Sequence, residues 1–165
     1  MAELLSHLLI IWGVLTIASW GLDRLTPRWI AVGVIGGIFP DLNRLGLLVA
    51  ESSVEGVFGI PFSWGGIHTL GGVLCLAGAG AMLFDREQAW AFVVLVAGGV
   101  IHLLTDAVKT YADGLGAMWL FPFSWVRLPT PNLYVSADPS VLVVSAVFVG
   151  VVFVIDWLVV GRDEE

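Results

Sequence analysis

The sequence predicts an all-α integral membrane protein, a bundle of about five transmembrane helices, from three observations. Of the 165 residues, 58% are hydrophobic and only 13% are charged, whereas soluble domains carry about a quarter charged residues. The apolar residues gather in five stretches, each close to the roughly 20 residues that a helix needs to cross the hydrocarbon core. Tryptophans stand at the ends of most stretches, as expected at membrane–water interfaces.

The distribution of charge excludes one large class of function. The formal net charge is −7, from 14 acids and 7 bases, and no run of Lys or Arg occurs. Nucleic-acid binding depends on clustered basic residues that neutralise phosphates. We therefore expect no nucleic-acid partner.

The predicted helices follow one another in a single transmembrane domain over residues 1–165. They cover residues 4–21, 29–50, 67–84, 89–108 and 141–160. The first is expected to be a permanent helix, because the N-terminus lacks the positive charge and the Ala-x-Ala site of a cleavable signal. Glycines are frequent in the second, third and fourth segments. Small residues let membrane helices approach closely, which predicts a tight bundle.

The second segment is expected to break at Pro40-Asp41. Proline removes a helical hydrogen bond and disfavours helical geometry at the preceding residue, Phe39. Non-helical backbone at membrane depth is tolerated only inside protein or beside a wet cavity, and broken helices mark binding sites in transporters. The alternative is a helix that ends at the interface and continues as an interfacial stretch.

A long connection, 109–140, separates the fourth and fifth segments. It contains six aromatic residues and four prolines and is too long for a passive link in a compact domain. We expect an interfacial flap whose Trp119, Phe121, Phe123 and Trp125 insert into the membrane surface. The alternative is a passive interfacial anchor.

Ionisable residues inside four of the segments fall at matching depths. They are the chain's three histidines, His7, His68 and His102, and two acids, Asp41 and Asp106. His7, Asp41 and His102 lie roughly 20 Å from one side of the bundle, counted at 1.5 Å per residue, and the other two lie about one turn farther from that side. A buried Asp costs about 2.5–3.5 kcal/mol on insertion scales. The five side chains are therefore expected to share one site near the side that holds the N-terminus.

These five residues, His7, Asp41, His68, His102 and Asp106, form a candidate metal-ligand set. The i, i+4 spacing of His102 and Asp106 places both on one helix face. Imidazole and carboxylate groups without a thiolate suit Zn²⁺, with Mn²⁺ and Fe²⁺ as alternatives. The other interpretation is that each histidine bonds a neighbouring helix and that His102 and Asp106 form a structural pair.

Short motifs surround these residues in a fixed order. They are Ser6-His7, Gly-Gly-x-x-Pro-Asp-Leu over 36–42, Gly-x-x-His-Thr over 65–69, His-Leu-Leu-Thr-Asp over 102–106, Thr110-Tyr111, and Pro122-Phe123. Their order and spacing resemble the membrane-bound metal-dependent hydrolases of the YdjM-like group, over most of the first 125 residues. The resemblance implies a metal hydrolase. Four positions depart from the family pattern. Asn43 stands where a second acid is common, Ser63 where a first histidine is common, Trp64 where an arginine is common and Ile67 where a threonine is common.

The residues and the resemblance together predict a metal-dependent hydrolase that acts on an amphipathic ester or phosphoester, such as a membrane lipid. One acid, Asp41 or Asp106, is expected to stay off the metal as general base. Arg44 and Lys109 flank the site and are expected to hold a substrate anion. Otherwise they are ordinary interfacial side chains.

Two other classes of function stay open. A small transporter or ion-binding protein would also use a broken helix and a polar cluster. A non-catalytic membrane relative of the hydrolases would explain Asn43 and Ser63.

The predicted location is the cytoplasmic membrane, with several crossings. Basic residues in short connections favour the cytoplasmic side. The side opposite the site carries Arg24, Arg28, Arg86 and Arg162, and the site side carries Arg44, Lys109 and Arg127. Because two residues of the second group lie beside the site, we discount them. We expect the site to face outward and the C-terminus to be cytoplasmic.

Overall fold

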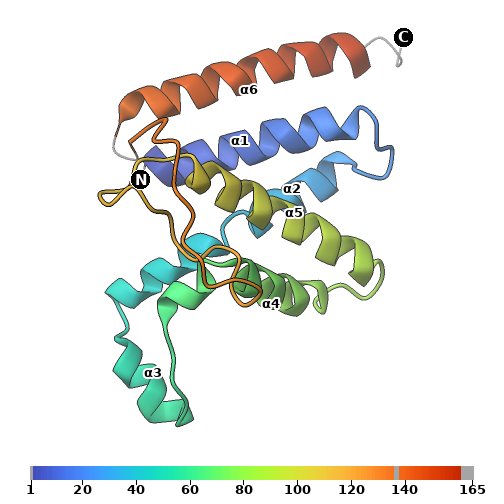
Figure 1. The fold of residues 1–165 in the computed structure, drawn as a ribbon. Coiled ribbons are helices and arrows are strands. Elements are labelled where there is room, and N and C mark those ends of the chain that lie inside the picture. The colour runs from blue at the N-terminus through green and yellow to red at the C-terminus, as the bar shows by residue number, and fades with distance from the viewer. Residues whose placement is uncertain (1, 136–137, 161–165) are drawn as a thin grey trace.

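The computed structural model describes residues 2–135 and 138–160, and the predicted all-α class is confirmed for them, since they contain helices and no strand. The α-helices are α1 (Ala2–Ser19), α2 (Pro27–Gly36), α3 (Glu51–Phe58), α4 (Leu70–Ala81), α5 (Gln88–Ala107) and α6 (Pro139–Val160), with two 3₁₀ helices, η1 (Pro40–Leu47) and η2 (Trp64–Ile67). α1 packs against α6 and α2, and α5 packs against α2 and α4. Figure 1 shows these helices running back and forth between two ends of the bundle.

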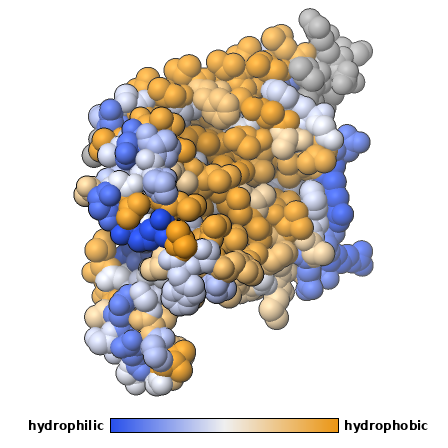
Figure 2. Space-filling view, viewed as in Figure 1, coloured by the Kyte–Doolittle hydropathy of each residue, from blue (hydrophilic) through white to orange (hydrophobic). Residues whose placement is uncertain are grey.

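Two helices, α5 and α6, are long and apolar enough to cross a membrane, and the bent pair of α2 and η1 would make a third span. The expected five spans are therefore not supported within the described residues. α1 and α4 are apolar but shorter, and at 1.5 Å per residue they fall below the roughly 30 Å of a hydrocarbon core. Figure 2 nevertheless shows a broad apolar belt between two more hydrophilic ends, as a membrane protein requires.

The predicted break in the second segment is present. α2 ends at Gly36, η1 begins at Pro40, and the two are bent by 42°. α2 also lies very close to α5, because a Cβ atom at Gly98 would collide with the backbone of Gly33, and one at Gly36 with the backbone of Leu95. This close approach brings the broken end of α2 against the middle of α5.

The third segment becomes helical later than expected. Thr69 caps α4, and its Oγ1 accepts a hydrogen bond from the amide of Gly72 at 3.2 Å. Threonine at this position favours a helix start, since its oxygen satisfies an otherwise unpaired amide. His68 therefore precedes α4. The prediction that it lies within the third helix is wrong.

One α-helix and the short 3₁₀ helix η2 were not predicted. α3 forms within the connection after η1 and ends at Gly59, whose φ of +67° suits glycine. Figure 1 shows α3 projecting away from the bundle. Its base is held by Glu51, whose Oε1 accepts hydrogen bonds from the Ser63 hydroxyl and the Trp64 amide.

The connection after α5 folds back over one end of the bundle and is only partly the expected flap. Trp119 is 6% exposed and packs with Val73 and Leu103, so its predicted insertion into the membrane surface is wrong. The reason is backbone pairing, because the amide of Leu70 donates to the carbonyl of Trp119 at 2.6 Å. Trp125, in contrast, is 70% exposed.

A basic side chain holds the rest of this connection. Arg127 donates to the carbonyls of Leu115 and Gly116 and pairs with Asp113 at 2.8 Å. The hydrogen bond from Arg127 lowers the pKa of Asp113 below its ordinary value. Arg127 therefore stabilises the conformation of this connection.

Candidate metal centre

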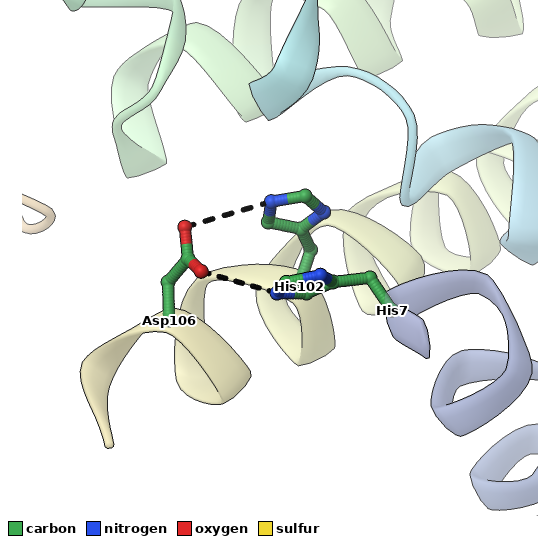
Figure 3. Close-up of side chains that lie close together, drawn as sticks. All are labelled: His7, His102 and Asp106. Carbon is green, nitrogen blue, oxygen red and sulfur yellow. Dashed lines mark hydrogen bonds and ion pairs between the residues drawn. The ribbon is translucent and has the colours of Figure 1, made fainter. Parts of the chain in front are cut away.

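The five predicted ligand residues converge at one end of the bundle. His7 comes from α1, Asp41 from η1, His68 from the junction before α4, and His102 and Asp106 from α5. Two groups have one ligand atom each within 4.8 Å of one another: His7, His102 and Asp106, and Asp41, His68 and His102. Figure 3 shows the first group, with α1 and α5 turning their side chains toward each other.

Asp106 is the hub of the cluster and is 2% exposed. Its Oδ1 lies 3.1 Å from His7 Nε2 and 3.0 Å from Lys109 Nζ. Its Oδ2 lies 2.7 Å from His68 Nε2 and 3.7 Å from His102 Nε2. The two oxygens thus face different partners.

The helix break determines which ring nitrogen carries the proton in two histidines. His102 Nδ1 lies 2.7 Å from the carbonyl oxygen of Gly37, and His68 Nδ1 lies 3.1 Å from that of Pro40. A carbonyl oxygen only accepts, so each Nδ1 carries the proton and donates it. In the neutral ring, His102 Nε2 then keeps its lone pair, 3.7 Å from Asp106 Oδ2. His68 Nε2 lies at hydrogen-bond distance from the same oxygen, 2.7 Å, and can hold a proton or, in its place, a metal ion. This is the arrangement found around metal-ligating histidines, whose second nitrogen bonds a backbone carbonyl.

Two buried polar atoms of the cluster have no hydrogen-bond partner among the described residues. They are His102 Nε2 and Asp41 Oδ2. Buried polar atoms are nearly always paired, because an unmade hydrogen bond costs free energy. The other oxygen of Asp41, Oδ1, already accepts from Arg44 Nε at 3.1 Å. An imidazole lone pair binds a metal ion directly, and a carboxylate oxygen can bind the ion or accept a proton from a water beside it, and so the residues fit a divalent cation.

A proton could take the place of a metal in only part of the cluster. An imidazolium of His68 would satisfy its 2.7 Å contact with Asp106, yet it would leave His102 Nε2 and Asp41 Oδ2 unpaired. A metal ion therefore satisfies more of the cluster than protons do.

A cavity of about 650 Å³ adjoins the cluster and is lined by His68 and Lys109. Its wall also includes Tyr111, Phe121 and Trp125, and two of the positions that depart from the family pattern. Those two positions are Asn43 and Ser63. The cavity gives the otherwise buried cluster an approach for a small molecule.

The structure brings together all five predicted ligand residues and Lys109. Arg44, the other predicted anion-binding residue, contacts Asp41 and does not line the cavity. The sequence analysis did not predict that the carbonyls of Gly37 and Pro40 bond the two histidines. The signal was the proline, because a helix that ends before it leaves carbonyl oxygens without a helical partner.

Comparison with known proteins gives one result. No curated protein and no solved structure is significantly similar to the chain. The profile of the family described as YdjM inner membrane protein matches residues 1–162. This chain therefore belongs to the YdjM inner membrane protein family.

Proposed function

We propose that this membrane protein is a metal-dependent hydrolase that acts on an amphipathic phosphoester. The observation that carries the proposal is the pair of buried, unpartnered donors, His102 Nε2 and Asp41 Oδ2, in a cluster that adjoins a cavity through His68. Family membership agrees with a location in the membrane, and the proposed activity is argued from the site.

His68, His102 and Asp106 would hold the metal, with Zn²⁺ as the first candidate for this nitrogen and oxygen set. When bound, such an ion lowers the pKa of a coordinated water toward neutrality. Asp41 is the acid best placed as general base, because Arg44 orients its Oδ1 while its Oδ2 has no partner. An unpartnered carboxylate oxygen is free to accept a proton from a water.

The cavity supports an amphipathic substrate with an anionic group. Lys109 lines the cavity and brings a cationic side chain to it, and Phe121 and Trp125 supply an aromatic wall. Trp125 is largely exposed, so the apolar part of a lipid-like molecule could extend along it. We assign the anion-binding role to Lys109 alone, since Arg44 does not line the cavity.

Zinc content and turnover of the purified full-length protein test this proposal. We expect near-stoichiometric zinc in the wild type and its loss in His102→Ala. Hydrolysis is measured with a fluorogenic phosphodiester that carries one acyl chain, against the same head group without the chain. Metal-free protein of unchanged fold would refute the proposal. Bound zinc without turnover of any ester would instead favour the non-catalytic relative, in line with Asn43 and Ser63 on the cavity wall.

A further inference from the structure

We propose that the centre takes a single metal ion, that the Lys109 ammonium occupies the place of a second cation, and that His7 positions Asp106 without binding metal. This inference rests on the metal binding proposed above. It concerns the number of ions and the roles of two residues, which family membership leaves open.

The two possible ligand groups compete for one atom. Both of them include His102. Its Nδ1 donates to the Gly37 carbonyl at 2.7 Å, so the ring has one lone pair, on Nε2, and can serve one ion. Two ions could not both be held by a full set of three side chains.

A positive charge already stands in one of the two groups. Lys109 Nζ lies 3.0 Å from Asp106 Oδ1, and both side chains are largely buried, at 16% and 2% exposed. A metal ion on the same oxygen would face an ammonium group at close range in a medium that screens charge poorly. The metal is therefore expected on the side of Asp106 Oδ2, which faces His68 and His102, the two imidazoles of the other group. The third member of that group, Asp41, is kept as the proposed base, and Asp106 supplies the carboxylate in its place.

His7 shares Oδ1 with Lys109, since its Nε2 lies 3.1 Å from that oxygen. An imidazole nitrogen that faces an occupied carboxylate oxygen is stable there as a donor, and a nitrogen that carries a proton has no lone pair for a metal. His7 and Lys109 together then hold the orientation of Asp106. His7 is a positioning residue by this argument.

The first measurement uses the unmodified full-length protein in detergent, loaded with Zn²⁺ and freed of excess ion. We expect one zinc per chain by elemental analysis and two imidazole ligands by X-ray absorption. Two zinc ions per chain, or three imidazoles on one ion, would overturn the inference and leave the proposed function standing. Protein that binds no zinc would overturn both.

Matched variants give the second measurement. His7→Gln keeps a donor for Asp106 and is expected to retain one zinc, whereas His68→Ala and His102→Ala lose it. Lys109→Met is expected to release zinc to a chelator several-fold more slowly than wild type, because a nearby positive charge is removed, while Lys109→Arg is expected to release zinc at the wild-type rate. If folded His7→Gln is as empty as His102→Ala, His7 is a ligand and the inference fails. If His7→Gln does not fold, the imidazole count of the wild type decides.

Discussion

The two acids of the centre share one pattern of contacts. Asp41 Oδ1 accepts a hydrogen bond from Arg44, and Asp106 Oδ1 lies within 3.1 Å of nitrogen atoms of Lys109 and His7. The second oxygen of Asp106 faces His68 and His102, and that of Asp41 is buried without a partner. Each carboxylate is thus oriented through its Oδ1. The Oδ2 of Asp106 is the proposed metal-binding atom, and the Oδ2 of Asp41 is the proposed proton acceptor.

The first prediction separates the two acids. Asp41→Asn is expected to keep its zinc while hydrolysis falls by about 10²-fold or more, because the amide cannot accept the proton of a water. Zinc per chain and turnover of the acylated phosphodiester are measured on the same preparation. Asp23→Asn, an exposed change in the connection before α2, serves as control. Loss of zinc in Asp41→Asn would make Asp41 a ligand.

The helices determine where these side chains can meet. α2 stops short of Pro40, and its close approach to α5 brings the Gly37 carbonyl within 2.7 Å of His102. The approach depends on glycines at the contact, since a Cβ at Gly98 would collide with Gly33. Helix packing and histidine orientation are therefore coupled.

The second prediction tests that coupling. Gly98→Ala is expected to destabilise the protein by about 1–3 kcal/mol, because overpacking forces the two backbones apart, and to weaken zinc binding by moving the Gly37 carbonyl. The thermal midpoint in detergent and the zinc content report the two effects. Gly78→Ala in α4 is the matched control, since a Cβ there has nothing within 4 Å. Equal stability of the two variants would contradict the packing argument.

The third prediction divides the tryptophans of the connection after α5. Trp119→Ser is expected to cost about 3–5 kcal/mol, the range for truncating a large buried aromatic. Trp125→Ser is expected to leave stability and zinc unchanged and to reduce turnover of the acylated substrate, because Trp125 is exposed on the cavity wall. Thermal midpoints and turnover of both variants are compared. If Trp125→Ser hydrolyses acylated and acyl-free substrates as the wild type does, the connection plays no part in lipid access.

At the scale of the whole molecule, the centre and its cavity lie at one end and a second charged group lies at the other. Arg24 and Arg28 pair with Glu87 at 3.7 and 2.6 Å, and Arg86 directly precedes Glu87 in the sequence. Arg162 is outside the described residues. We propose that this arginine-bearing end is cytoplasmic, by the preference of basic residues for that side.

The fourth prediction concerns this orientation. In a Cys75→Ala background, Ser53→Cys on α3 is expected to react with an impermeant maleimide in intact cells, and Asp85→Cys at the opposite end is not. Both positions are exposed, so access to the reagent decides the result. Permeabilised cells, in which both should react, are the control. The reverse labelling would place the centre on the cytoplasmic side.

Composition and spacing by themselves determined an all-helical membrane chain, the break at Pro40 and the set of five residues, because burial in lipid admits few polar side chains and proline cannot continue a helix. The tertiary structure decided the rest. It reduced the supported spans to two or three, placed His68 before α4 and buried Trp119. It also turned the Gly37 and Pro40 carbonyls toward two histidines. The burial of Trp119 and the two carbonyl contacts depend on how closely distant segments approach, and no local pattern of residues encodes that distance. The start of α4 follows instead from the local cap at Thr69.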